Sequence, residues 1–250
     1  MPDTPLLASR YQVGDLLGTC GTAEVRRGRD TLLARDVAIK FFRPGRDPVD
    51  ARRIDDEIRA LARLSHPGLV TVFDADPAAD IPYAVLERLE GPTLDDRVAA
   101  GPMGASEVRR LGAALADALA HVHAYGFVHR GVTPSTVLLG DDDAPRLADL
   151  GPARLAPSRA PGGQVATAVD VYALGLVLLE CLTGRRQWRP QVPDDLPFDL
   201  KRLLMSMTSQ SAARRPTALE CARALPAVAP PTLVAPLPRR PRGAYLPASA

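Results

Sequence analysis

The stretch HRGVTPSTVLLGDDDAPRLADLG, residues 129–151, decides the fold of this chain. It holds a polar turn, a short apolar run over Val137–Leu139, an acidic turn, and then Asp149-Leu150-Gly151. The apolar run predicts a buried strand, and the acidic turn predicts a reversal into a second strand. Polar side chains at both ends of a buried strand are typical of a binding or catalytic site.

The composition is that of an ordinary globular protein. The 250 residues are 46% hydrophobic and 24% charged, which is enough for a sizeable core, and the net charge of +2 does not indicate a nucleic-acid binder. Three scattered cysteines argue against a zinc site or a disulfide framework and fit a reducing cytoplasm. The N-terminal residues are too short and polar for a signal peptide, and the apolar run 169–183 is too short to span a bilayer. We therefore expect a cytoplasmic protein in which this run is a buried core helix.

The first ninety residues predict a strand-rich part with one helix. Strands are expected over 11–17, 23–27, 35–42, 70–74 and 83–86, because apolar residues alternate there. Apolar residues at three- and four-residue spacing predict a helix from about Asp50 to Leu64, with Glu57 beside its apolar face. The GTCG segment at Gly18 favours a plain hairpin turn when it is considered alone.

The rest of the chain predicts helices. They are expected over 94–99, from a Ser106 N-cap through about Val122, and in the regions of 198–207 and 217–225. His121 and His123 stand at the end of the second of these helices, where its dipole favours them. From Pro226 onward the chain is rich in proline, which predicts an extended tail with little packed structure.

Five motifs in sequence resemble the protein kinase family, in particular its bacterial Ser/Thr branch. They are V-A-I-K ending at Lys40, the helix residue Glu57, H-R-x from His129, D-L-G from Asp149, and D-V-Y-x-L-G from Asp170. The resemblance implies an α+β, two-lobed protein-kinase-like fold with a small β-rich lobe and a larger helical lobe. Its boundaries are an N-terminal extension over 1–10, a kinase-like domain over 11–225 (lobes 11–87 and 91–225) and a tail over 226–250.

The resemblance also implies a nucleotide site. In the family the strand lysine pairs the phosphates and the helix glutamate, the D-L-G aspartate binds Mg²⁺, and the hinge binds adenine through its backbone. The implied ligands are thus ATP and Mg²⁺, the latter through Asp149. The residues that match the family's nucleotide-binding positions are Gly18, Val25, Ala38, Lys40, Glu57, Glu87, Leu89, Leu138 and Asp149.

The positions that carry chemistry in the family are changed. Gly131 stands where the family keeps its catalytic Asp, Thr133 where Ser/Thr kinases keep a Lys, and Thr136 where the metal-binding Asn stands. The A-P-E signature that should follow the D-L-G is not recognisable, so the family partner of Arg215 is missing as well. Ordinary protein-kinase activity is therefore not expected.

Three functions are compatible with this sequence. One is a pseudokinase that binds ATP weakly and acts as a regulatory or scaffold module through contact with another protein. The second is an atypical Ser/Thr kinase of low activity, and the third is a scaffold that binds no nucleotide. A nucleic-acid partner and a transmembrane segment are not expected, whereas the arginines of the Pro-rich tail, Arg239, Arg240 and Arg242, offer a contact to a partner.

Overall fold

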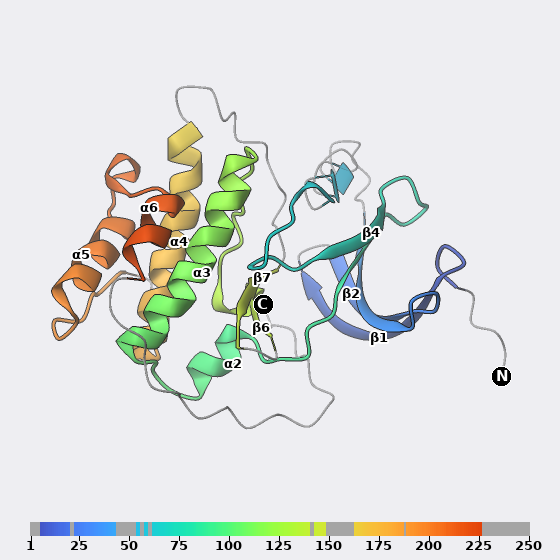
Figure 1. Cartoon of the computed structure of the whole chain (residues 1–250), viewed down its shortest axis with the longest axis horizontal. Coiled ribbons are helices and arrows are strands. Elements are labelled where there is room, and N and C mark those ends of the chain that lie inside the picture. Colours follow the sequence, from blue (N-terminus) through green and yellow to red (C-terminus); the bar gives the residue numbers. More distant parts are fainter. Residues whose placement is uncertain are drawn as a thin grey trace. The chain divides into compact units, whose positions relative to one another are not determined.

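The fold was analysed in a computed structural model that describes residues 6–20, 23–43, 54–55, 58–59, 62–140, 143–148, 163–187 and 189–226. The described chain divides into two compact units. The first holds the residues up to Ser65 together with Val70–Leu89, and the second holds His66–Leu69 and the residues from Glu90 onward. The predicted α+β class is confirmed, because the first unit is built on a sheet and the second mainly on helices (Figure 1).

The first unit is a five-stranded antiparallel sheet in the order β1-β2-β3-β5-β4. Its strands are β1 (Tyr11–Cys20), β2 (Ala23–Asp30), β3 (Arg35–Phe42), β4 (Val72–Asp76) and β5 (Tyr83–Glu87). The predicted strand over 35–42 is correct in both bounds. Strands β1 and β2 each run three residues further than predicted, because cross-strand pairing continues to Cys20 and to Asp30.

The two faces of this sheet have different roles. One face carries a core of Tyr11, Val37, Ile39, Tyr83 and Val85, all of which are buried. Since side chains alternate along a strand, the residues between them in β3 point to the opposite face. Val25, Ala38 and Lys40, three of the residues that the resemblance implies for nucleotide binding, lie on that opposite face.

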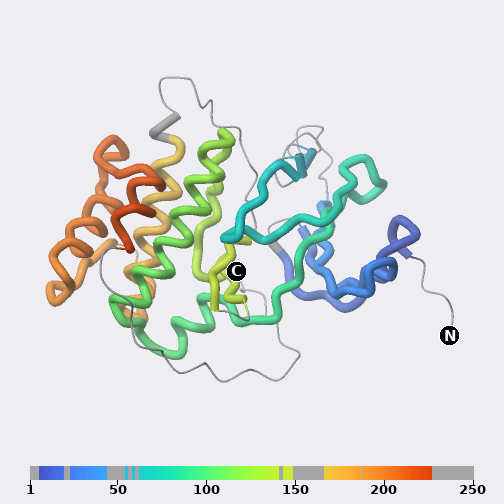
Figure 2. The backbone as a smooth tube through the Cα atoms, viewed as in Figure 1, coloured from blue at the N-terminus to red at the C-terminus, as the bar shows by residue number. Residues whose placement is uncertain are grey.

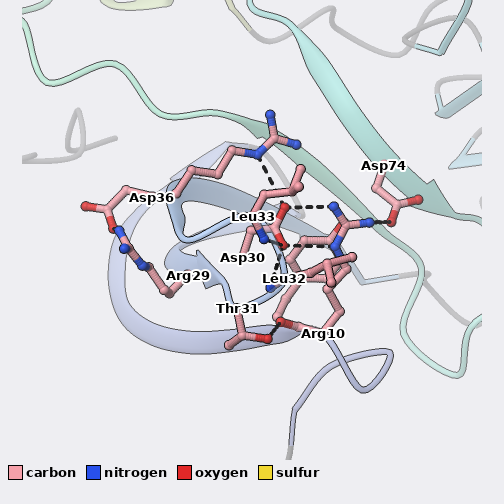
Figure 3. A network of polar contacts seen from close by, with 10 residues as sticks. Arg10, Arg29, Asp30, Thr31, Leu32, Leu33, Asp36 and Asp74 are labelled. Atoms are coloured by element: carbon pink, nitrogen blue, oxygen red, sulfur yellow. Dashed lines mark hydrogen bonds and ion pairs between the residues drawn. The ribbon is translucent and has the colours of Figure 1, made fainter.

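Residues just before β1 are fixed to the sheet by a buried ion pair. The Arg10 guanidinium donates two hydrogen bonds to Asp30, at 2.9 and 2.8 Å, and Asp30 is fully buried (Figure 3). Arg35 and the Leu33 N–H also donate to Asp30, and the Tyr11 hydroxyl donates to Asp74 at 2.7 Å. The Arg10 guanidinium, more than the other donors, holds the pKa of Asp30 well below its usual range.

The described part of the second unit contains five α-helices and a small hairpin. Its helices are α2 (Leu94–Ala99), α3 (Ala105–Ala124), α4 (Gly163–Thr183), α5 (Phe198–Met207) and α6 (Ala218–Ala224), and its hairpin pairs β6 (Val137–Leu139) with β7 (Pro145–Leu147). Helix α3 packs against α4 and α6, and the course of the three helices can be followed in Figure 2. The predicted Ser106 N-cap is wrong: the N-cap of α3 is Gly104, two residues earlier.

Helix α4 is longer than the sequence predicted. Its residues Ala166–Thr183 are apolar and numerous enough to cross a membrane, with a mean hydropathy of 1.6, so the expectation that this run is too short was wrong. Half of that window is buried inside the protein, and its Asp170 is fully buried. The helix also packs against α3 and α5, which supports its interpretation as a core helix.

Candidate functional site

Three predicted nucleotide-binding residues share one face of the sheet in the first unit. Val25 in β2 pairs with Lys40 in β3, and Ala38 lies two residues before Lys40 on the same side. Lys40 is only 3% exposed, and its Nζ lies 5.0 Å from the centroid of the Phe42 ring, within cation–π range. A buried ammonium beside two small apolar side chains fits a surface that takes a base and its phosphates.

Gly18 belongs to a strand rather than to a loose loop. It pairs with Val25, and the next residues pair on to Cys20 and Ala23, so only two residues connect β1 to β2. The strand pairing also shifts its register between Leu16 and Gly18. This pairing joins β1 and β2 as a hairpin, and the prediction that its turn is a plain one falls on Gly21 and Thr22, which lie outside the described residues.

Glu87 and Leu89 end the first unit. The Glu87 N–H donates to Thr71 O at 2.8 Å, and the Glu87 carboxylate accepts from the Thr71 N–H at 3.2 Å. These two contacts tie both the backbone and the side chain of Glu87 to Thr71. Leu89 follows as a half-buried side chain.

In the second unit the loop from His129 is held by one buried carboxylate. The His129 N–H donates to Asp170 at 2.8 Å and the Arg130 N–H donates to it at 2.7 Å. Arg130 has a φ of 60°, a left-handed conformation that costs energy for a residue with a side chain. Asp170 therefore fixes a strained turn. The resemblance implies the same role, because in the family the Asp of this helix holds the backbone of the catalytic loop.

His123 is a part of this arrangement that sequence reasoning missed. Its Nε2 lies 2.8 Å from the Asp170 carboxylate. The helix dipole was the only role expected for it, because its partner is far away in the sequence. No local pattern indicates this contact, because 47 positions separate His123 from Asp170.

The hydroxyl of Thr136 closes the loop on itself. It donates to Gly131 O at 2.6 Å and to Thr133 O at 3.0 Å, and it accepts from the Thr133 N–H at 3.0 Å. The Thr133 hydroxyl lies 2.9 Å from that of Ser135. The structure thus brings the three altered positions, Gly131, Thr133 and Thr136, into one hydrogen-bonded turn.

Leu138 is placed by the segment that follows the first unit. It lies in β6 and forms a bridge with Thr93, while the Leu139 N–H donates to Pro92 O at 2.9 Å. A Cβ at Gly91 would lie 1.7 Å from Leu139 O, so only glycine permits this approach of two backbones. Leu138 is half-buried in this position.

The guanidinium of Arg215 has other partners in place of the glutamate that pairs with it in the family. It donates to Ser209 O at 2.8 Å and to Ala168 O at 2.9 Å, and its guanidinium carbon lies 4.5 Å from the centroid of the Tyr172 ring. Backbone carbonyls and an aromatic ring thus take the place of a carboxylate. Arg215 thereby ties the segment before α6 to helix α4.

The donor set fits a nucleotide better than a second metal ion. The Thr136 hydroxyl uses its one proton within the loop and accepts a hydrogen bond there, so it does not present a metal ligand as the family's Asn does. Across the described residues, no group of three or more His, Cys, Asp or Glu side chains is placed to hold a metal ion. The predicted Glu57 and Asp149 lie outside the described residues. The resemblance also implies that Leu61 and Leu150 stack with His129, and these two leucines lie outside the described residues as well.

The sequence as a whole is similar to known protein kinases. A family model described as the protein kinase domain matches residues 11–224. The DNA damage-responsive serine/threonine-protein kinase RqkA of Deinococcus radiodurans is 35% identical, in a match that covers 86% of this chain and 39% of RqkA. The serine/threonine-protein kinase PknB of Mycobacterium leprae is 36% identical over 74% of this chain, and PrkC of Bacillus subtilis is 32% identical over 77% of it.

The chain spans between about a third and two fifths of the length of these relatives. The matched part nevertheless runs from β1 to the end of α6, through the sheet, the loop held by Asp170 and the helices around it. This chain belongs to the protein kinase family.

Proposed function

We propose that this chain is a catalytically impaired kinase domain, a pseudokinase, that binds ATP weakly and acts by contact with another protein. Gly131 carries the proposal. It stands at the position of the catalytic Asp, in a loop that Asp170 and Thr136 otherwise hold in shape. A positioned general base contributes about 10²–10⁴-fold to the rate, and glycine has no side chain to supply one.

The backbone does not require a glycine at this position. The glycines in the left-handed region within the described chain are Gly101, Gly126 and Gly184, and Gly131 is not one of them. A side chain is therefore sterically compatible with the backbone conformation at residue 131. The backbone conformation thus does not explain why residue 131 is a glycine, and the glycine leaves the position without a side chain that could act as a general base.

Lys40 supports nucleotide binding as part of the proposal. It is a buried cation on the sheet face that also carries Val25 and Ala38, at the position whose Lys pairs the nucleotide phosphates in the family. When bound, Mg²⁺ would neutralise phosphate charge, and Asp149 is the residue proposed to hold it. Thr136 is not proposed as a ligand.

The test is a phosphorylation assay on the purified chain with labelled ATP and Mg²⁺. We expect no autophosphorylation and no transfer to a generic Ser/Thr substrate. Turnover that Lys40→Met and Asp149→Asn both abolish would contradict the proposal. That result would favour an atypical kinase of low activity, which the names of the relatives also support.

A thermal-shift titration separates the pseudokinase from a scaffold without nucleotide. A ligand that binds only the folded state raises the melting temperature. We expect millimolar ATP–Mg²⁺ to raise it for the unmodified chain and to leave it unchanged for Lys40→Met. No shift in either protein would favour the nucleotide-free scaffold.

A further inference from the structure

Three arginines of the first unit converge on one carboxylate. Asp36 Oδ2 accepts from Arg27 at 3.2 Å and from Arg88 at 2.6 Å, and Asp36 Oδ1 accepts from Arg29 at 2.8 Å. Figure 3 shows Arg29 beside Asp36. Two cations, Arg27 and Arg29, share this one anion. The arginine cluster (Arg27, Arg29, Arg88 and Asp36) therefore has a surplus of positive charge that does not depend on Arg88.

The strand register builds this cluster. Arg29 is paired with Asp36, and Arg27 with Ala38, so both arginines project from the face of β2 and β3 that carries Lys40. Arg88 follows Glu87, which pairs with Val37, and this places Arg88 one step further, across from Asp36. The cluster therefore extends across three neighbouring strands.

Two of the three guanidinium groups are open to a ligand. The side chains of Arg27 and Arg29 are 51% and 47% exposed, while that of Arg88 is 17% exposed. Within the described part of the chain, Asp36 is the only hydrogen-bond partner of the Arg27 guanidinium and of the Arg29 guanidinium. A guanidinium has five N–H donors, so each of these two has donors to spare for a further acceptor.

A solvated surface would not need this arrangement. Isolated surface arginines spread apart, because like charges repel and their long side chains lose entropy when they are fixed. Here the Asp36 carboxylate accepts hydrogen bonds from three planar guanidinium groups and holds them close together. Arg presents donors in the geometry that carboxylates and phosphates match, and prior ordering lowers the entropy that binding costs.

We infer that the arginine cluster is the docking site for an acidic segment of a protein partner. Its carboxylates would add to that of Asp36 and neutralise the surplus charge. This inference rests on the proposed function, in which the chain acts by contact with a protein. Its test uses no ATP, so it can fail while nucleotide binding is confirmed, and the reverse also holds.

The test measures binding of a fluorescent octaglutamate peptide to the whole chain by anisotropy, at low and at high salt. An octaglutamine peptide is the neutral comparison. We expect the double variant Arg27→Gln/Arg29→Gln to weaken octaglutamate binding roughly tenfold or more, because hydrogen bonds to charged groups belong to the stronger class. Added salt should weaken binding to the unmodified chain and should change the variant less.

The matched control is Arg59→Gln/Arg110→Gln, which removes the same charge from two exposed arginines outside the cluster. It should change the affinity by less than about twofold if the site is local. Equal losses in both double variants, or no binding by the unmodified chain, would overturn the inference. So would tighter binding of a single-stranded oligonucleotide that depends on Arg27 and Arg29. Melting curves establish that the variants are folded.

Discussion

The Thr136 hydroxyl donates a hydrogen bond to the carbonyl oxygen of Gly131 at 2.6 Å. Thr136, which stands where the family has its metal-binding Asn, thus holds Gly131, which stands where the family has its catalytic Asp. The loop is closed by its own hydroxyl groups.

This relationship predicts how the loop responds to substitution. Thr136→Val keeps the branched shape and removes the hydroxyl, so Gly131 O and the Thr133 N–H lose their partner. We expect a loss of about 1–2 kcal/mol in the free energy of unfolding, measured by urea denaturation. Thr136→Ser retains the hydroxyl and should lose clearly less; equal losses would show that the methyl group, and not the hydrogen bond, matters.

Asp170→Ala should be the most damaging single change in this loop. It removes a fully buried carboxylate that accepts from the His129 and Arg130 N–H groups and contacts His123. Two buried donors are left without this acceptor, and each costs about 1–3 kcal/mol. We expect a loss above about 3 kcal/mol by urea denaturation.

Asp195→Ala is the comparison for that change, because Asp195 is exposed on the segment before α5. Its effect should stay within about 0.5 kcal/mol. If Asp170→Ala were as mild as Asp195→Ala, the loop would be held by contacts other than the Asp170 carboxylate.

The Asp30 carboxylate predicts a dependence of stability on pH. Its pKa is lower in the folded chain than in the unfolded chain, chiefly because of the Arg10 guanidinium. A depressed pKa stabilises the fold above the unfolded value of about 4, and this contribution is lost as the pH falls toward the folded pKa. Unfolding free energies at pH 7 and pH 3 should therefore differ less for Asp30→Asn than for the unmodified chain. If Asp30→Asn lost as much unfolding free energy between pH 7 and pH 3 as the unmodified chain, other carboxyl groups would cause the loss.

Local patterns predicted the elements well. Strand β3 and helices α2 and α5 have the predicted bounds, and several of these bounds adjoin a residue that ends the pattern: Arg43 after β3, Thr93 before α2, and Pro197 and Thr208 on either side of α5. The first turn of α4 and the start of α3 were less well predicted. Gly163–Ala166 has no apolar periodicity, and Gly104 caps α3 without a side-chain hydrogen bond.

Contacts between distant residues were beyond the sequence pattern. The hydrogen bond of His123 to Asp170 joins residues 47 positions apart, and the Arg88–Asp36 contact joins residues 52 apart. No local periodicity encodes such pairs, since they depend on strand register and helix packing. Asp170 was predicted to hold the loop only because it resembles a family position.

The close packing at Gly91 predicts that even a methyl side chain there lowers the stability of the fold. A Cβ there would lie 1.7 Å from Leu139 O, a backbone atom that cannot move alone. We expect Gly91→Ala to lower the free energy of unfolding by more than about 2 kcal/mol and to displace β6. Gly104→Ala is the control, because its Cβ would meet open space, and it should cost less. Equal effects would mean that the backbone near Gly91 moves freely.

The two buried cysteines predict a chemical property. Cys181 and Cys221 are fully buried, and burial raises the pKa of each thiol to about 12. The reactive species is the thiolate, which is scarce at pH 8 when the pKa is this high. In a brief exposure to iodoacetamide at pH 8, mass spectrometry should find both cysteines unmodified in the folded chain. Both should be fully modified in urea, where their pKa returns to the ordinary range. Rapid labelling of either cysteine without urea would show that helix α4 or α6 opens readily, and would contradict the packing seen here.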